Sequence, residues 1–218
     1  MRIAIFGASG LIGQGVLLQA LEHPAVEHVL SVGRRTLDLD HPKLRQLVHR
    51  DFLDFSSIAD QLRGLDACFW CLGTASAGMR EADYARITVD FTIAAAAVLR
   101  AENPSLCFCF VSGAGTDDTG TGRAMWARVK GNAENALRDL DFARLHLFRP
   151  GFIKSTRGNS PRGRLASAAV AGLHPLMTAV GLGTTNTAIG DAMLAVATTG
   201  SDRVVLDSRA INALAEDA

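Results

Sequence analysis

The sequence lacks an excess of charge of either sign, because 22 lysines and arginines balance 22 aspartates and glutamates in 218 residues. A neutral chain has no bulk field that would attract nucleic acid or an anionic membrane. We therefore expect no nucleic-acid partner, and any anion that the protein binds must be held by local geometry. The hydrophobic content of 48% is that of a globular protein with one sizeable core.

A signal peptide and a long apolar run are also missing. The first residues show no basic region followed by an apolar stretch and a small-residue cleavage site. The most apolar stretch, 165–182, is interrupted by His174, Pro175 and two glycines, which makes it a poor membrane span. We therefore expect a cytoplasmic protein without a membrane span.

Patterns that bind metals or form nucleophiles are absent too. The six histidines have no ligand-like spacing, and the sequence around Ser112 is not a G-x-S-x-G nucleophile elbow. The cysteines form the pairs Cys68-x-x-Cys71 and Cys107-x-Cys109 inside apolar runs typical of buried strands, where free cysteine is common. We predict core cysteines rather than a zinc or redox site, and no metal.

Apolar, strand-like runs alternate with helical segments through the first 150 residues. Strands that are apolar on both faces and alternate with helices indicate a parallel sheet covered on both sides. The fold class predicted is therefore α/β, a Rossmann-type doubly wound parallel sheet, with its ligand crevice at the carboxyl ends of the strands. The expected strands are 2–6, 26–32, 44–48, 65–72, 106–111 and 142–148, and the expected helices are 11–22, 81–101 and 123–140.

The alternation changes after residue 151. Residues 154–164 are basic and rich in Gly, Ser and Pro, and they predict a loop whose cations are either solvated or in contact with an anionic ligand. We expect this loop to be followed by helices at 164–180 and 186–198, a strand at 203–206 and a terminal helix. The sequence thus predicts a single domain over 1–218, with 154–200 as a small, mostly helical C-terminal lid on the substrate side.

The turn after the first strand has the composition of a phosphate-binding site. Gly7, Gly10 and Gly13 directly follow an apolar strand and open an amphipathic helix, which is the context that a dinucleotide-binding turn requires. In such a turn the first glycine allows the sharp bend, the second lets a phosphate approach and the third lets the helix pack on the sheet. We predict that the cofactor contacts Gly7, Ser9, Gly10, Leu11, Ile12 and Gly13.

The second strand ends with two arginines, at the place where an NAD-binding site usually has an acidic residue. A carboxylate repels a 2′-phosphate, whereas guanidinium groups bind it through charge-assisted hydrogen bonds. Arg34 and Arg35 therefore favour NADP over NAD as the cofactor. The alternative is a solvated basic turn.

Two further segments fit the adenosine half of a dinucleotide. Asp51 would accept the adenine amino group and Phe52 would cover the ring, because both follow the third strand. The backbone after the fourth strand would run beside the ribose. Its residues are Cys71, Leu72, Gly73 and Thr74. Residues of these types also end strands for ordinary structural reasons.

Together with Ser112-Gly113, Val129-Lys130-Gly131 and Phe148-Arg149-Pro150-Gly151, these motifs resemble the short-chain dehydrogenase/reductase superfamily. The resemblance is to its atypical, NAD-dependent-epimerase-like branch and, within it, to the Tat-interacting-protein-like oxidoreductase family. The motifs occur in order over residues 3 to 153. The resemblance implies that Ser112 bonds the substrate carbonyl, and that Lys130, together with Pro150, contacts the cofactor.

The family pairs the lysine with a tyrosine four residues earlier, but this sequence has Trp126 at that position. One helical turn places Trp126 and Lys130 on one face. An indole N–H donates a hydrogen bond but does not titrate, whereas a phenol does. We therefore expect Trp126 to polarise a carbonyl without protonating it, or to pack on the nicotinamide or on an apolar substrate.

Three other side chains are candidate proton donors. Tyr84, which is the single tyrosine, lies on the helix that begins at the crevice, and Asp117 and Asp118 follow Ser112. The alternatives are packing for Tyr84 and solvation or loop capping for the two aspartates.

The sequence as a whole predicts an NADP(H)-binding oxidoreductase or epimerase-like enzyme of unidentified small-molecule substrate that lacks the usual catalytic tyrosine. The alternative is a non-catalytic NADP(H) sensor that acts through a protein partner. The superfamily resemblance also allows a homodimer through the helices at 81–101 and 123–140.

Overall fold

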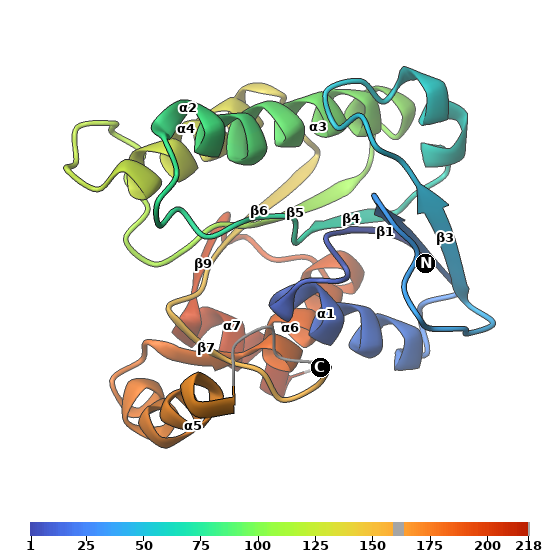
Figure 1. Ribbon diagram of the computed structural model, residues 1–218. Helices are drawn as coiled ribbons and strands as arrows, with labels where there is room; N and C mark the ends of the chain where they lie inside the picture. The colour runs from blue at the N-terminus through green and yellow to red at the C-terminus, as the bar shows by residue number, and fades with distance from the viewer. Residues whose placement is uncertain (159–163, 218) are drawn as a thin grey trace.

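A computed structural model describes residues 1–158 and 164–217, with the side chains of 164–170 excepted. Seven parallel strands form one sheet in the order β3-β2-β1-β4-β5-β6-β9 (Figure 1). The strand order reverses beside β1, and in open sheets of this kind ligands bind at that point, outside the carboxyl ends of the strands. The strands are β1 (Arg2–Phe6), β2 (His28–Gly33), β3 (Leu44–Val48), β4 (Ala67–Trp70), β5 (Cys107–Val111), β6 (Arg144–Arg149) and β9 (Val205–Asp207).

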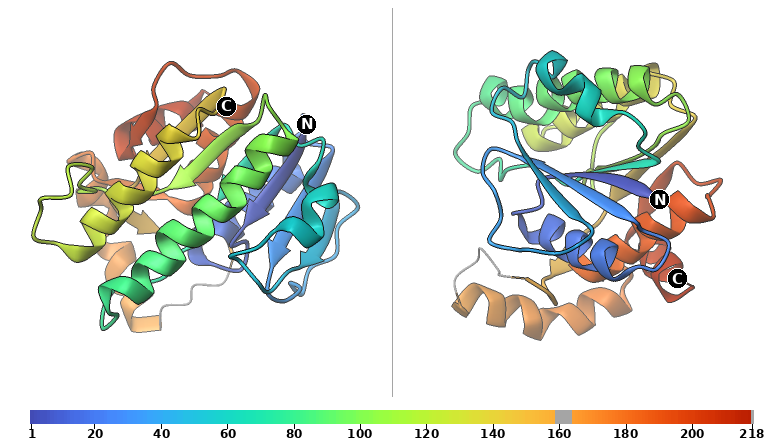
Figure 2. Two further views of the ribbon diagram at one scale, coloured as in Figure 1. Left: turned by 90° about the horizontal axis from the view of Figure 1, so that it is seen from above. Right: turned by 90° about the vertical axis from the view of Figure 1, so that its right-hand side faces the viewer.

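Helices cover both faces of this sheet, as Figure 2 shows. The predicted α/β, doubly wound architecture is therefore confirmed. One face carries α1 (Leu11–Glu22), α6 (Asn186–Thr198) and α7 (Ser208–Glu216). The other carries the 3-10 helix η1 (Ser56–Leu62), α2 (Glu81–Ala85), the π-helical turn η2 (Arg86–Asp90), α3 (Phe91–Glu102) and α4 (Met125–Asp139).

Two separate cores explain why the strands are apolar on both faces. Ile3 and Ile5 of β1 pack into the core beneath α1 and α6, whereas Ala4 and Phe6 pack into the core beneath α3 and α4. All four side chains are fully buried. Burying a large apolar side chain contributes about 1.5–3 kcal/mol, so both faces of the central strands stabilise the fold.

The predicted helix 81–101 is interrupted. Its middle is the π-helical turn η2, where the amide of Phe91 donates to the carbonyl oxygen of Arg86, five residues back. Just beyond it, the Thr92 hydroxyl donates to the carbonyl oxygen of Thr88 at 2.8 Å. The spacing of apolar residues along the sequence does not reveal one extra residue in a single turn. The sequence therefore predicted a regular helix.

The C-terminal part contains a second, two-stranded parallel sheet that the sequence did not predict. β7 (Phe152–Lys154) pairs with β8 (Gly183–Thr185), and α5 (Arg164–Ala179) connects them. Strands of three residues are too short to show an alternation of apolar and polar residues in the sequence.

None of the helices in the described part of the chain has the length and apolar character that a membrane span requires.

The predicted lid over 154–200 is smaller in the structure, because α6 is part of the main core. Ile189 and Met193 of α6 are fully buried. A Cβ on Gly15 of α1 would lie 2.6 Å from the Asn186 side chain, so α1 and α6 pack closely. Within the described part of the chain, β7, α5 and β8 lie beside the main sheet, and Asn212 of α7 bonds Gly183 of β8 at 2.9 Å.

Candidate cofactor and substrate site

The glycine turn lies between β1 and α1, and protein contacts account for two of its three glycines. Gly7 has φ +79°, and a Cβ there would lie 2.6 Å from the amide nitrogen of Leu72. A Cβ on Gly13 would overlap the carbonyl oxygen of Gly7. A Cβ on Gly10 would meet that oxygen at 3.3 Å and no other atom within 4 Å. Gly10 is thus the glycine that internal packing requires least, as expected where a ligand approaches.

The first turn of α1 presents backbone N–H groups beside Gly10. Gly10 caps the helix without a side-chain hydrogen bond, and its own amide donates to Gly7 at 2.9 Å. Within the described part of the chain, the amides of Leu11 and Ile12 have no acceptor. Free N–H groups at a helix N-terminus, together with the helix dipole, favour an anion.

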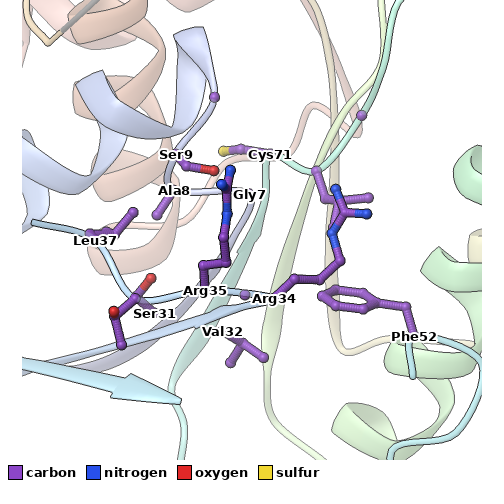
Figure 3. A pocket seen from close by; sticks show the side chains of 15 residues that line it. Gly7, Ala8, Ser9, Ser31, Val32, Arg34, Arg35, Leu37, Phe52 and Cys71 are labelled. Carbon is purple, nitrogen blue, oxygen red and sulfur yellow. The ribbon is translucent and has the colours of Figure 1, made fainter. Parts of the chain in front are cut away.

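A cleft of about 310 Å³ lies in front of the turn, and Arg34 and Arg35 extend into it from the end of β2 (Figure 3). Arg35 lies on the side of the glycine turn and Arg34 on the side of Phe52. Both arginines are exposed, and neither forms a hydrogen bond or ion pair with another described residue. Their guanidinium donors are therefore available to an anion in the cleft.

Phe52 forms a wall of this cleft and Asp51 does not. Phe52 is 3% exposed, and its ring meets Phe6 edge to face at 6.5 Å. The Asp51 carboxylate accepts the amide of Leu53 at 3.0 Å, so it shapes the turn after β3. The predicted cover for an adenine ring thus has its place in the cleft, whereas the predicted acceptor for the amino group lies outside the lining.

The backbone after β4 forms the opposite wall. Cys71, Leu72 and Gly73 line the cleft, and the Cys71 amide continues the sheet by donating to Phe6 at 2.9 Å. Burial raises the pKa of Cys71 to about 12, so it stays a neutral thiol. Thr74 is exposed and is not part of the cleft lining.

Ser112 follows β5 directly, and its amide donates to Phe148 of β6 at 2.7 Å. The Thr116 hydroxyl donates its single proton to the carbonyl oxygen of Gly113 at 2.8 Å. In the 2.9 Å contact between the two hydroxyls, Ser112 must therefore be the donor. The proton of Ser112 is thus committed to Thr116.

Lys130 reaches from α4 to the end of β5. Its Nζ donates to the carbonyl oxygen of Val111 at 3.2 Å and lies 5.6 Å from the centroid of the Phe110 ring. Burial lowers the pKa of Lys130 to about 8, and the charge of Glu134 partly opposes this effect. The ammonium group therefore lies next to the strand end that leads into Ser112.

Trp126 lies one helical turn before Lys130, and its indole covers the loop after β5. A Cβ on Gly115 would lie 3.5 Å from the indole, and one on Gly113 would lie 3.7 Å from it. The indole therefore packs over backbone that carries no side chains. This packing explains how a ring larger than a phenol fits at this position.

A second cavity, of about 490 Å³, lies beside Trp126. Ser112 carries the one polar side chain among its described lining residues, and the others are glycine or apolar. Pro150 lines this cavity rather than the glycine-turn cleft. The apolar walls include Trp126, Pro150, Phe152, Ile153, Met177 and Leu182.

Tyr84 has a core position rather than a position in either cavity. The side chain is 2% exposed on α2, which packs against α4. Burial raises the pKa of Tyr84, and a hydrogen bond with the Thr88 side chain opposes the rise. The packing alternative therefore fits this residue.

The two aspartates after Ser112 organise their own loop. Asp117 accepts hydrogen bonds from the hydroxyl of Thr119 at 2.6 Å and the amide of Gly122 at 2.6 Å, which lower its pKa. Asp118 forms an ion pair with Arg149 at 3.1 Å. These contacts fit the alternative in which the two aspartates cap the loop and do not donate a proton.

The cysteines and the basic loop have structural partners. All four cysteines are free. The predicted core role is confirmed for Cys68, Cys107 and Cys109, which are buried, whereas Cys71 is half-buried and lines the cleft. The described residues contain no cluster of metal-ligating side chains. Arg157 pairs with Glu22 at 2.5 Å and holds the loop to α1. Lys154 lies on β7; Arg162 and the Arg164 side chain lie outside the described part.

Sequence reasoning missed Glu134. It is an acid on the same face of α4 as Trp126 and Lys130, and it is fully buried. The spacing of four residues between these three positions was the available signal.

Comparison with known sequences agrees with the motifs. No family model matches the chain. The chain is 28% identical to Protein HTATIP2 of Rattus norvegicus over 99% of its own length and 89% of the relative's. It is also 28% identical to "Protein fmp52-2, mitochondrial" of Aspergillus oryzae, over 89% of this chain and 85% of that protein.

Solved structures share the fold at low identity. UDP-glucuronic acid 4-epimerase from Bacillus cereus, in complex with UDP-glucuronic acid and NAD, matches with a TM-score of 0.69 and 15% identity, over 95% of this chain and 77% of that one. The Bordetella bronchiseptica enzyme WbmH in complex with NAD+ matches with a TM-score of 0.68 and 14% identity, over 94% and 74%. These findings confirm the predicted resemblance: the chain is similar to HTATIP2, and it has the fold of UDP-glucuronic acid 4-epimerase and WbmH.

Proposed function

We propose that the chain binds NADP(H) along the carboxyl edge of the sheet and acts as an oxidoreductase or epimerase-like enzyme on a small molecule bound beside Trp126. The observation that carries the proposal is the pair Arg34 and Arg35 in one cleft with Gly10, the glycine of the turn that internal packing requires least. A 2′-phosphate and a pyrophosphate are the two anionic groups that such a cleft would hold.

The cleft residues divide the binding of the cofactor between them. Arg34 and Arg35 would bind the 2′-phosphate, and the free amides at the start of α1 would bind the pyrophosphate. Phe52 would cover the adenine. Lys130 would donate hydrogen bonds to the nicotinamide ribose, because its ammonium group lies at the end of β5. The solved neighbours named above hold NAD, whereas the two arginines support NADP here.

The chemistry supplied by a bound nicotinamide is hydride transfer. Ser112 and Lys130 would position the reacting groups, and Trp126 would present an apolar face or an N–H donor to the substrate. Trp126 cannot deliver a proton, and positioned acid–base catalysis contributes about a hundred- to ten-thousandfold. We therefore expect slow turnover compared with an enzyme that has tyrosine at position 126.

Calorimetric titration with NADPH and NADH tests the cofactor proposal directly. We expect NADPH to bind at least tenfold more tightly, the gain of about one charge-assisted hydrogen bond. Equal affinities would contradict the preference, and no binding of either would overturn the proposal. Oxidation of NADPH with a panel of aldehydes, ketones and quinones then tests catalysis, with Lys130→Ala as the inactive control.

A second candidate function is a non-catalytic NADP(H) sensor that acts through a protein partner. Trp126 at the tyrosine position favours it, as does the committed proton of Ser112. Tight NADPH binding without turnover on any member of the panel would select the sensor. Loss of turnover in the Lys130→Ala variant would select the enzyme.

We also propose a cytoplasmic location for a single-domain protein. Four free cysteines suit a reducing compartment. The fungal relatives carry "mitochondrial" in their names, so mitochondria are the competing compartment. Fractionation of cells that express the tagged chain distinguishes the two, and a purely mitochondrial signal would overturn the proposal.

A further inference from the structure

Glu134 forms a buried, two-point ion pair with Arg149. The Arg149 Nε donates to Oε1 at 2.9 Å, and Nη2 donates to Oε2 at 2.5 Å. The Glu134 side chain is fully buried, and that of Arg149 is 19% exposed. Arg138, one turn later on α4, makes a longer contact with Oε2 at 3.5 Å.

The pair connects the two elements that carry the proposed site. Glu134 lies one turn after Lys130 on α4, and Arg149 ends β6 directly before Pro150, which lines the cavity beside Trp126. Arg149 also bonds the carboxylate of Asp118 in the loop that follows Ser112. Helix, strand end and loop therefore meet at one guanidinium group.

Stability alone does not account for an ion pair in this place. Removing two charges from water is costly, and well-packed apolar residues often replace a buried ion pair without loss of stability or with a gain. A two-point pair between guanidinium and carboxylate does, however, fix both distance and orientation. Its specific contribution is geometric.

We propose that Glu134 and Arg149 are positioning residues for the proposed site: their ion pair fixes the turn of α4 that presents Lys130 against the end of β6 that presents Pro150. The proposal rests on the cofactor site proposed above. Neither residue lines the cofactor cleft or the substrate cavity, so each acts through Lys130 and Pro150.

Electrostatics gives the pair a second effect on Lys130. Burial lowers the pKa of Lys130, and Glu134 is the charged residue that opposes this effect. Arg149 lies next to Glu134 and pairs with it, and it also pairs with Asp118. Glu134 therefore helps Lys130 keep the proton with which it would bind the ribose.

Lysine NMR gives a readout that a purely structural role would not change. The chain has three lysines, Lys43, Lys130 and Lys154, so a ¹³C-lysine sample shows three side-chain signals. In Glu134→Gln we expect the titration midpoint of Lys130 to fall by about one pH unit, the effect of losing a nearby opposite charge. The midpoints of Lys43 and Lys154 should not move.

Glu81→Gln is the matched control. It breaks the more exposed Arg128–Glu81 ion pair, which ties the same helix α4 to α2 at 2.8 Å. We expect Glu134→Gln to weaken NADPH binding about tenfold at pH 7.5, as for the loss of one charge-assisted hydrogen bond, and Glu81→Gln to leave it unchanged. Equal losses in both variants would overturn the positioning role.

The lysine titration needs no cofactor, so it remains informative if the wild-type chain fails to bind NADPH and the proposed function itself fails. If the single variant does not fold because Arg149 loses its buried partner, Glu134→Gln combined with Arg149→Met removes both charges. NADPH binding should still be weaker in that folded double variant, because the two-point link between α4 and the end of β6 is lost. Normal NADPH binding in it, or an unchanged Lys130 midpoint in folded Glu134→Gln, overturns the proposal.

Discussion

Ser112 donates its hydroxyl proton to Thr116 at 2.9 Å, because Thr116 has already given its own proton to the carbonyl oxygen of Gly113. The family resemblance assigns Ser112 to the substrate carbonyl. In this structure the hydroxyl must rotate away from Thr116 before it can bond a substrate.

A double-mutant cycle of Ser112→Ala and Thr116→Val measures this link. We expect a coupling of about 1 kcal/mol in the free energy of unfolding, the net contribution of one buried hydrogen bond. Urea unfolding of the four proteins provides the values. Additive effects, within about 0.3 kcal/mol, would show that the two hydroxyls do not form this bond in solution.

The glycine turn gives a prediction with an internal control. Gly10→Ala should lower the free energy of unfolding less than Gly13→Ala does, because its Cβ meets one protein atom, in a tight contact at 3.3 Å. Gly13→Ala should destabilise the fold by about 1–3 kcal/mol, because its Cβ overlaps the Gly7 carbonyl.

The effect of Gly10→Ala on NADPH affinity should be larger than its effect on stability. Gly10→Ala should lose at least tenfold in affinity, about 1.4 kcal/mol, because the methyl group occupies the phosphate position. Calorimetry on the folded variant checks it. Normal affinity in Gly10→Ala would show that the phosphates lie elsewhere.

The two arginines should discriminate between the cofactors. Arg34→Ser and Arg35→Ser should each raise the Kd for NADPH about tenfold or more, since a charge-assisted hydrogen bond contributes about 1.5–3 kcal/mol. NADH affinity should stay the same. Arg45→Ser is the control, because Arg45 bonds Gln61 and does not line the cleft. Parallel losses of NADH and NADPH would contradict binding of the 2′-phosphate.

Much of the fold could be predicted because the central strands are buried on both faces. Ile3 to Phe6 fill two cores at once, so the apolar run before Gly7 is long enough to be distinctive. The end of β2 at Gly33 could be predicted for the same reason, and with it the position of Arg34 and Arg35 in the cleft. The local sequence determines these features.

The parts that sequence reasoning missed depend on long-range contacts. The role of α6 depends on a close approach of Asn186 to Gly15, residues 171 positions apart in the chain. Asn186 also donates to the carbonyl oxygens of Leu11 and Arg157, at 3.0 and 2.8 Å. No local pattern shows that one buried amide connects these three segments.

Substitutions of Trp126 test how far the site differs from that of an enzyme with tyrosine at position 126. Trp126→Tyr should restore a titratable donor beside Lys130, and we expect about a hundredfold rise in any reductase activity, the lower range of positioned acid catalysis. Trp126→Phe is the matched control, because it loses the indole without gaining a hydroxyl. Measuring NADPH oxidation in both separates the hydroxyl from the change in packing.

The smaller rings of Trp126→Tyr and Trp126→Phe should also lower the free energy of unfolding. The indole covers Gly113 and Gly115, and a phenol leaves part of that surface bare. We expect both Trp126 variants to lose about 1–2 kcal/mol, less than the full truncation of a buried aromatic side chain. No gain of activity in a folded Trp126→Tyr variant would mean that the surrounding geometry has diverged together with the residue.

The buried Lys130 side chain predicts that the free energy of unfolding increases with pH. Its pKa is about 8 in the folded chain and 10.5 as the ordinary value. Between these values the unfolded chain binds more protons than the folded one, so this group makes the free energy of unfolding rise with pH. The full rise is about 3 kcal/mol, and none of it is present below pH 8.

Lys130→Met isolates this contribution from the cysteines. Burial raises the pKa of Cys68 and Cys71, so these thiols favour the unfolded chain above pH 9 and oppose the lysine. Because both proteins contain these thiols, the difference in unfolding free energy between wild type and Lys130→Met cancels their effect. That difference should grow in favour of the wild type from pH 8 upward. A difference independent of pH would show that Lys130 keeps its ordinary pKa and that its ammonium group remains in solvent.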